Sequence, residues 1–324
     1  MFDRVWPIVS AALLAGCAGP AAVASADPET SSKSNWRPYP GTSKDEEFLK
    51  NTPSQYRPFV EACNPWDDWD KPAPPFKIFG STYYVGTCGI SAILLVGDDK
   101  HILIDSGTEG GAEIVLANIR TLGFDPADIV YILHSHEHFD HVGGFARIKA
   151  VTDGDIVASA DAAEPIATGI ASPDDPQAGM HDTMTPVAVS RIIEDGGQVT
   201  TKAFTVTAIE TPGHTLGALS WVWKDCDAET GCLTLGYADS LSPISRDGYR
   251  FSDNPLLLAR HEAGLEKFGR TDCHILLTPH PSSSRMLKRM RNDDLVQSGS
   301  CAYYAMDRFR AMEKRLAEEA EGAQ

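Results

Sequence analysis

The sequence predicts an α/β protein in which two β-sheets pack face to face and carry helices on their outer sides. Short runs rich in β-branched and aromatic residues fall into two clusters, within 76–107 and 203–240, and segments with helical apolar spacing accompany each cluster. Two such sheets bury their apolar faces best against each other. With 324 residues and 42% hydrophobic side chains, the chain is long enough for one sizeable core.

The first cluster predicts a meander of strands, because glycine or aspartate separates its apolar runs. Its strands are expected over 76–80, 82–87, 91–97 and 101–107. The continuous apolar run 128–135 predicts a strand buried on both faces, and 155–169 predicts a strand followed by a helix.

The second cluster predicts strands over 203–213, 218–225 and 232–240. A helix over 254–268 and a strand over 273–280 follow. The stretch 171–186 is polar and contains proline and methionine, so we expect a long loop that forms a lid or a pocket rim.

Two helices are predicted from their apolar spacing, together with the face that each would bury. In the helix over 110–123 this face is Ile114, Ala117 and Leu122. In the helix over 301–320 it is Ala302, Met306, Phe309 and Leu316.

The N-terminus predicts an export signal over 1–17, because the apolar run 5–14 is shorter than the roughly 20 residues that span a bilayer. Leu14-Ala15-Gly16-Cys17 resembles a lipobox, in which Cys17 would be lipidated. The alternative is ordinary cleavage after residue 26. Polar residues dominate 18–58, which we interpret as a flexible arm, and 59–324 as a single domain.

The chain contains seven cysteines, of which six remain if Cys17 is lipidated. An even number suits disulfides in an oxidising compartment. Proximity favours Cys226–Cys232 across a hairpin, which leaves Cys63–Cys88 and Cys273–Cys301. The alternative is that several are free, buried cysteines.

The net charge of −17 argues against nucleic acid as a partner, because binding phosphates needs a basic patch. Membrane anchoring is expected only through a lipidated N-terminus. We expect the periplasm of a bacterium as the location, with an outer-membrane lipoprotein as one form, and a monomer as the oligomeric state.

The stretch "SHEHFDHVGG" (135–144) concentrates metal ligands on one turn. His136, His138, Asp140 and His141 follow the strand predicted over 128–135 and precede two glycines. Nitrogen and oxygen donors without thiolate suit zinc, with iron or manganese as alternatives. The zinc motif HExxH does not fit, because Asp140 stands where its second histidine belongs.

Two distant histidines complete the candidate site. His214 lies in "ETPGHTLG" and His280 in "LLTPHPS", each at the end of a predicted strand. Three strand ends that each carry histidine are hard to explain by packing alone, so we expect all of them to meet at one edge of the fold.

In this order and spacing, "SHEHFDHVGG", "TPGHT", "YADSLS" and "LLTPHPS" resemble the metallo-β-lactamase superfamily, and subclass B3 most. The resemblance runs from about Phe76 to Leu316. It implies an αββα sandwich with two mixed sheets and two zinc ions per chain. By resemblance the first zinc has the ligands His136, His138 and His214, and the second has Asp140, His141 and His280.

The resemblance implies hydrolysis of the β-lactam amide bond by a metal-bound hydroxide, and hence β-lactam resistance. Asp140 would bind metal and orient the nucleophile as the catalytic residue. Ser240 and Ser242 would bind the substrate carboxylate. We interpret Asp105 as a residue that orients ligand histidines. If the protein is a β-lactamase, we interpret Asp239 as structural. The alternative is the metal-bridging aspartate that some related lactone hydrolases have at a comparable place.

Several residues beside the motifs keep open interpretations. Glu137 replaces the alanine usual in the subclass and is interpreted as solvated; the alternative is an influence on metal affinity. His134 is predicted to be a buried, hydrogen-bonded histidine. Trp66 and Trp69 are expected either at a pocket mouth or packed on the domain. The remaining histidines are treated as structural or surface residues: His101, His181, His261 and His274.

Two alternatives to a β-lactamase remain. One is an acyl-homoserine lactonase or another ester or thioester hydrolase on the same scaffold. The other is a metal-bearing binding lipoprotein without turnover, against which the intact ligand set argues.

Overall fold

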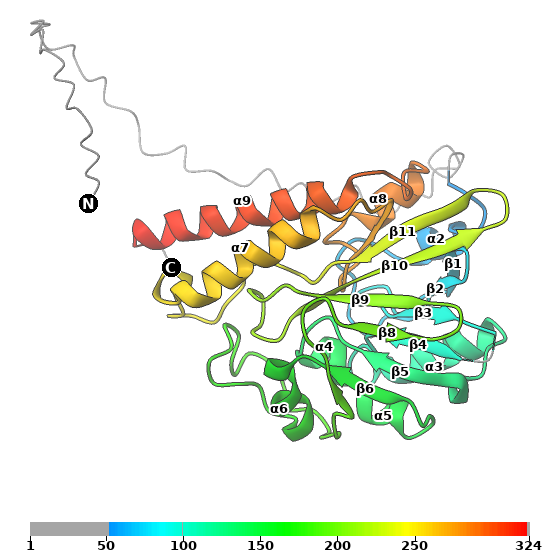
Figure 1. Ribbon diagram of the computed structural model, residues 1–324, viewed down its shortest axis with the longest axis horizontal. Coiled ribbons are helices and arrows are strands. Elements are labelled where there is room, and N and C mark those ends of the chain that lie inside the picture. Colours follow the sequence, from blue (N-terminus) through cyan, green and yellow to red (C-terminus); the bar gives the residue numbers. More distant parts are fainter. Residues whose placement is uncertain (1–51, 99, 323–324) are drawn as a thin grey trace, which may run out of the picture. The chain divides into compact units, whose positions relative to one another are not determined.

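The computed structural model describes residues 52–98 and 100–322, which form two β-sheets packed face to face with helices outside (Figure 1). This is the predicted αββα sandwich. The predicted signal peptide, Cys17, both cleavage sites and most of the arm lie outside the described residues. Within the described part of the chain, we find no helix with the length and apolarity that a membrane crossing needs.

The first sheet has seven strands in the order β1 to β7. Neighbours pair antiparallel up to β4 and parallel from there on. Its strands are β1 (Phe76–Phe79), β2 (Thr82–Tyr84), β3 (Ile93–Val96), β4 (His101–Ile104), β5 (Ile129–Leu133), β6 (Asp155–Ala158) and β7 (Arg191–Ile192).

The second sheet has the order β12-β11-β10-β9-β8, in which only the β11–β12 pair is parallel. Its strands are β8 (Gln198–Thr200), β9 (Thr205–Glu210), β10 (Leu219–Asp227), β11 (Gly231–Tyr237) and β12 (Ile275–Leu277). The sheets share a core because strand side chains alternate between faces. In β3, Ile93 and Leu95 face the second sheet, whereas Leu94 packs under the outer helices.

Helices cover the outer face of each sheet (Figure 1). Those beside the first sheet are α3 (Gly111–Thr121), α4 (Phe139–Val142), α5 (Phe145–Lys149) and α6 (Ala160–Thr168). The second sheet carries α7 (Pro255–Gly269) and α9 (Ser300–Ala320). The remaining helical segments are α2 (Arg57–Ala62), α8 (Met286–Arg291) and the 3-10 turns η1 (Pro126–Asp128) and η2 (Phe251–Asp253).

Both helices exist, but each predicted face was only partly right. Leu122, Phe309 and Leu316 pack partly buried against the core, whereas Ala117, Ala302 and Met306 are exposed. In α3 Ala117 is exposed, and the buried side chains include Ala112, Val115, Leu116 and Ile119. In α9 Met306 is 52% exposed, while Cys301, Tyr304, Ala305 and Met312 are buried. Each helix carries more than one apolar stripe, and the position of the sheet beneath it decides which stripe is covered.

The described residues contain three disulfides: the pair that proximity favoured and the two pairs that this choice left. Cys63 joins Cys88, Cys226 joins Cys232 across the β10–β11 hairpin, and Cys273 joins Cys301. The last pair connects the segment before β12 to the start of α9.

The packed domain begins before residue 59, the boundary predicted from composition. Tyr56 is buried, and its hydroxyl donates to the carbonyl of Ile78 at 3.1 Å. Phe59 in α2 is fully buried, with its ring centroid 5.1 Å from that of Phe76 and 4.9 Å from that of Tyr84.

We expect Phe59→Ala to lower the free energy of unfolding by about 3–5 kcal/mol, because it leaves a cavity between these rings. Equilibrium unfolding in denaturant, with the disulfides intact, measures the loss. The matched control Glu61→Ala changes an exposed residue of the same helix and should stay within about 0.5 kcal/mol. Equal effects of the two variants would contradict this packing.

Candidate metal centre

The predicted ligands meet where strands of both sheets end. The motif segment 134–141 follows β5, His214 follows β9, and His280 follows β12. His136, His138 and His214 are buried, and their candidate ligand atoms all lie within 4.8 Å of one another. The sequence placed these three residues at one metal ion, and the structure brings them together.

The second predicted set lies beside the first. Asp140 Oδ2 is 3.0 Å from His141 Nε2 and 3.3 Å from His280 Nε2. Ligand atoms of Asp140 and His141 also lie within 4.8 Å of His136. The two clusters therefore adjoin each other, with Asp140 and His141 between His136 and His280.

Each histidine of the three-histidine cluster uses its other ring nitrogen to contact a partner. The Nδ1 atom of His136 is 2.7 Å from Asp239 Oδ1, and that of His214 is 3.0 Å from the carbonyl oxygen of Ser242. The Nε2 atom of His138 is 3.2 Å from Asp175 Oδ1. These contacts turn the remaining nitrogens toward the cluster.

The second cluster repeats this arrangement. His141 Nδ1 is 3.5 Å from Asp105 Oδ2, and His280 Nδ1 is 3.3 Å from the carbonyl oxygen of Gly89. Meanwhile His136 Nε2 is buried and has no hydrogen-bond partner among the described residues. Metal-binding histidines characteristically donate the other ring N–H to a carboxylate or carbonyl. The donor set therefore fits a divalent metal ion.

Electrostatics differ among the predicted ligands. Burial alone would lower the pKa of His138, but Asp175 outweighs it and raises that pKa. Burial acts in the same direction at His141, where Asp140 with Asp105 raises the pKa to about 10. Burial lowers the pKa of both His136 and His214 well below the usual value, and neighbouring histidines add to this effect, so both imidazoles are neutral. Burial alone would raise the pKa of Asp140, but the charges and hydrogen bonds of His141 and His280 outweigh it and hold that pKa well below its usual range. Asp140 is therefore ionised.

Asp105 contacts the segment that carries the ligands, as predicted for a residue that orients a ligand. Its carboxylate accepts hydrogen bonds from the backbone N–H and hydroxyl of Ser135, both at 2.7 Å, and from the Tyr237 hydroxyl at 2.7 Å. Asp105 also has a left-handed backbone, with φ of 59°. Asp239 contacts His136, which agrees with its interpretation as a supporting residue.

Glu137 is not solvated, so that interpretation was wrong. The residue is 3% exposed, and its carboxylate accepts hydrogen bonds from Thr215 Oγ1 at 2.7 Å and from the Gly217 backbone N–H at 2.9 Å. Burial raises its pKa and the charge of Asp175 adds to this, while the hydrogen bond from Thr215 opposes it. Both partners belong to the turn that carries His214, which a motif comparison does not reveal.

The predicted rim loop 171–186 reaches the metal ligands with residues that the sequence reading missed. Asp175 is buried against His138, and the Gln177 side-chain amide lies 3.3 Å from His214 Nε2. His181, treated as a structural or surface residue, belongs here too, because its ring centroid is 4.7 Å from that of His138. The loop's polar composition indicated a pocket rim, but not which side chains turn inward.

The two predicted substrate-binding serines differ in accessibility. Ser242 is partly exposed, and its hydroxyl is 3.1 Å from His214 Nδ1. Ser240 is 3% exposed, and its hydroxyl has no hydrogen-bond partner among the described residues. Tyr304 of α9 donates its hydroxyl to the Ser240 carbonyl at 2.8 Å, which holds this segment from behind.

Trp66 and Trp69, for which the sequence left open a pocket mouth or packing on the domain, lie beside the centre. Their ring centroids are 6.3 and 6.5 Å from that of His280, and Trp69 is also 6.0 Å from His181. Both indoles are exposed, at 64% and 40%.

The remaining histidines lie away from the ligand set. His134 is buried as predicted, and its Nε2 accepts a hydrogen bond from the Ser159 N–H at 3.1 Å. His261 is buried against the Pro212 carbonyl, with Nδ1 at 2.9 Å, and His274 Nδ1 accepts from the Thr234 N–H at 3.2 Å.

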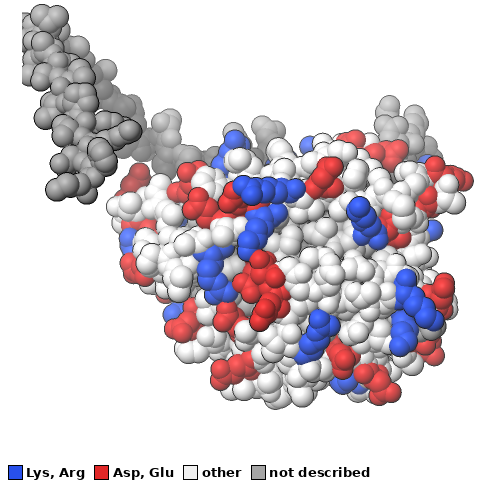
Figure 2. Space-filling model, in the orientation of Figure 1, with Lys and Arg blue, Asp and Glu red and all other residues white. Residues whose placement is uncertain are grey.

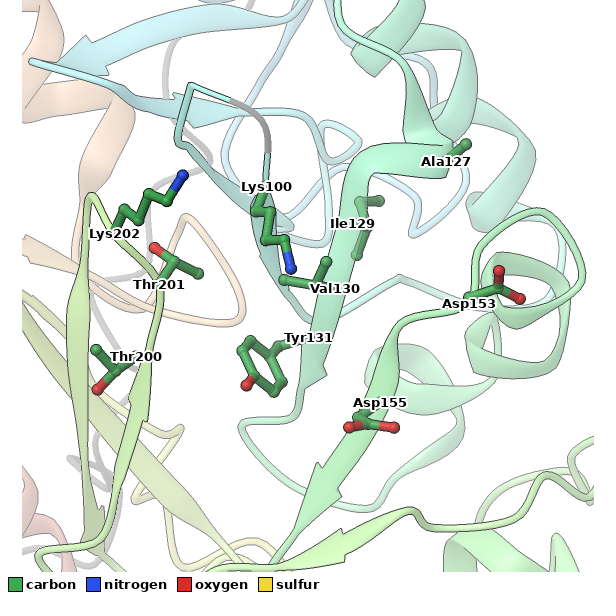
Figure 3. A pocket seen from close by; sticks show the side chains of 10 residues that line it. All are labelled: Lys100, Ala127, Ile129, Val130, Tyr131, Asp153, Asp155, Thr200, Thr201 and Lys202. Carbon is green, nitrogen blue, oxygen red and sulfur yellow. The ribbon is translucent and has the colours of Figure 1, made fainter.

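A cavity of about 480 Å³ lies at the opposite ends of the strands and is not part of this centre (Figure 3). Its lining includes Lys100, Tyr131, Asp155 and Thr200, at or near the beginnings of β4, β5 and β6 and at the end of β8. On the molecular face in Figure 2, acidic and basic side chains are interspersed.

Known proteins are similar to this chain in sequence and in architecture. Residues 85–224 match the family described as "Metallo-beta-lactamase superfamily". The solved structure of the metallo-β-lactamase MIM-1 from Novosphingobium pentaromativorans is 46% identical, covers 82% of this chain and 99% of its own, and has a TM-score of 0.79. MEM-A1, a subclass B3 metallo-β-lactamase from a soil metagenome library, is 36% identical over 79% of this chain and all of its own, with a TM-score of 0.75.

Curated relatives match over a shorter region. A hydroxyacylglutathione hydrolase of Rhodospirillum rubrum is 31% identical over 152 residues, which is 44% of this chain and 50% of that protein. The chain thus spans about half the length of this relative. Because the resemblance to the solved β-lactamases extends over almost their whole length, the chain belongs to the metallo-β-lactamase superfamily and is a hydrolase of the subclass B3 type.

Proposed function

We propose that this protein hydrolyses the amide bond of β-lactams with two zinc ions. The observation that carries the proposal is the adjoining pair of ligand clusters, in a chain 46% identical to MIM-1 over nearly all of that protein. The family implies a divalent metal, typically zinc. The number of ions follows from the donor count, because six ligands in two groups give each zinc three protein ligands and an open position.

In this assignment His136, His138 and His214 hold one ion, and Asp140, His141 and His280 hold the other. Bound zinc supplies a Lewis acid for the carbonyl oxygen and lowers the pKa of a coordinated water toward 7. The supporting contacts to Asp239, Asp175 and Asp105 fix the orientation of the imidazoles, so the ligands need little rearrangement when metal binds.

Asp140 is the protein group placed to handle the proton of the attacking water. It is ionised and buried, and it lies in the second cluster where this adjoins the first, so its carboxylate can accept a hydrogen bond from that water and orient it. Hydrolysis by water needs no acyl-enzyme, so this mechanism assigns no covalent role to a serine.

The surroundings suit a small, anionic substrate with an apolar body. Ser242 is accessible and can donate to the substrate carboxylate, whereas the buried hydroxyl of Ser240 would reach it only through a bridging water. Trp66 and Trp69 offer apolar ring surface beside His280.

A substrate panel tests the proposal. The zinc-loaded protein should open a chromogenic cephalosporin and a carbapenem, and clavulanate, which acts on serine enzymes, should not inhibit it. An acyl-homoserine lactone and a glutathione thioester serve as competing substrates at equal concentration. Efficient lactone or thioester cleavage with negligible β-lactam turnover would refute the proposal.

That result would favour the second candidate, a thioester or lactone hydrolase on the same scaffold. The match to hydroxyacylglutathione hydrolase supports this candidate, but it covers less than half of the chain. The solved β-lactamase MIM-1 matches over a far larger part, 82% of this chain.

A further inference from the structure

Glu137 lies between two ligands of the three-histidine cluster, yet its carboxylate contacts a different segment of the chain. One oxygen accepts a hydrogen bond from Thr215 Oγ1 and the other from the Gly217 N–H, at 2.7 and 2.9 Å. A buried carboxylate with a donor on each oxygen is well satisfied. Glu137 therefore ties the motif segment to the turn that carries His214.

The turn around His214 is tight and is fixed on its N-terminal side. The Gly213 N–H donates to the Thr215 carbonyl at 2.9 Å, and Gly213 has a φ of +146°. A Cβ atom at Gly213 would lie 2.1 Å from His261 Nδ1, so only glycine fits against this histidine.

On the C-terminal side, the turn is held at both backbone groups of Gly217. Its N–H donates to Glu137, and its carbonyl accepts from Ser159 Oγ at 2.7 Å. Ser159 in turn donates its N–H to His134 Nε2, three residues before Glu137. A closed ring of buried hydrogen bonds thus joins the turn and the motif.

The neighbouring connection between these segments is a backbone bond from the Leu219 N–H to the Ser135 carbonyl, at 2.7 Å. That bond lies beyond Gly217 and does not reach the residues beside His214. Within the described residues, the side chain of Glu137 is the group of the motif that contacts Thr215 directly. Without this side chain, the neighbouring bond between the motif and the segment after His214 would be the one from Leu219 to Ser135, five residues beyond His214.

We propose, on the basis of the function proposed above, that Glu137 is a positioning residue. It sets His214 relative to His136 and His138, and thereby sets the affinity of this cluster for its zinc ion. The cluster of Asp140, His141 and His280 does not depend on the bonds of Glu137, so the effect is specific to one of the two sites.

Zinc titration of the full, folded protein in competition with a chromophoric chelator tests this proposal. Glu137→Ala should weaken one of the two zinc affinities by about 10–100-fold and leave the other unchanged, as for other residues that support metal ligands. Glu137→Gln should retain most of the affinity, because its carbonyl still accepts from Gly217 and the Thr215 hydroxyl can turn to accept from the amide. Glu164→Ala, an exposed glutamate of α6, is the control.

Wild-type affinity at both sites in Glu137→Ala would overturn the proposal, as would an equal loss at both sites, which marks a general structural role. If Glu137→Ala fails to fold, Thr215→Val removes one of the two bonds and should weaken the same site to a smaller extent; unchanged affinity in that variant would overturn the proposal as well.

Because these measurements do not use hydrolysis, they separate this proposal from the β-lactamase assignment. Failure to open β-lactams would leave the zinc result intact. An active β-lactamase whose Glu137→Ala variant keeps both zinc affinities would refute only the role of Glu137.

Discussion

Removal of metal by a chelator should abolish hydrolysis, and added zinc should restore it. Without metal, His136, His214 and the ionised Asp140 hold no electrophile, so the largest contribution to the rate is lost. We expect a loss of at least about 10³-fold in kcat/KM, by comparison with the removal of one electrostatic stabilising group in other hydrolases. A spectrophotometric assay with a chromogenic cephalosporin measures it.

Circular dichroism of the chelated protein is the control, because the three disulfides and the two-sheet core should keep the fold. Metal analysis of the restored enzyme should give two zinc ions per chain. Full activity after exhaustive chelation would contradict the metal mechanism, and activity that saturates with one zinc would contradict the two-ion assignment.

Replacement of Asp175 by asparagine should lower zinc affinity by about 10–100-fold, because its carboxylate contacts His138 Nε2 at 3.2 Å. One oxygen of Asp175 also accepts from the Gln177 N–H at 2.6 Å, a bond that the asparagine carbonyl can keep. That oxygen is also the one at 3.2 Å from His138 Nε2, so the substitution removes the carboxylate's charge and puts an NH2 group in place of Oδ2, 3.3 Å from the same ring nitrogen, where it cannot accept a hydrogen bond. Competition with a chelator measures the affinity, and kcat/KM at limiting zinc should fall with it.

The neighbouring residue provides a matched control. Asp174 is exposed, so Asp174→Asn changes the charge of the same loop without removing a contact to the centre. The interpretation predicts wild-type zinc affinity for it. Similar losses in both variants would point to the loop's net charge instead of the contact with His138.

The sequence predicts the two-sheet fold and the metal ligands because both leave local patterns. Alternating apolar residues mark strands, and ligands cluster at strand ends, as in "SHEHFDHVGG" and "TPGHT". Asp105 and Asp239 could be assigned supporting roles because each directly follows a strand or belongs to a recognisable motif.

Other features depend on tertiary contacts and leave no such pattern. The covered face of α3 includes Val115 and Leu116 instead of Ala117, because the sheet selects among several apolar stripes. Glu137 and Asp175 belong to charged residue types that are mostly exposed, so burial is not the default expectation for either. Each carboxylate can be buried because a residue distant in sequence contacts it. Glu137 accepts a hydrogen bond from the Gly217 N–H, and Asp175 contacts the ring of His138.

Tyr304 connects α9, a helix in the outer layer of the fold, to the segment beside the metal centre. Its hydroxyl holds the Ser240 carbonyl, and the Cys273–Cys301 bridge fixes the start of the same helix to the segment before β12. Near the N-terminal end of the domain, the carbonyl oxygen of Gly89 contacts His280 Nδ1. The groups that orient the centre therefore come from distant parts of the domain. Because Tyr304 holds the segment whose residues Asp239 and Ser242 contact His136 and His214, we expect metal affinity to weaken in a chain whose α9 has not docked.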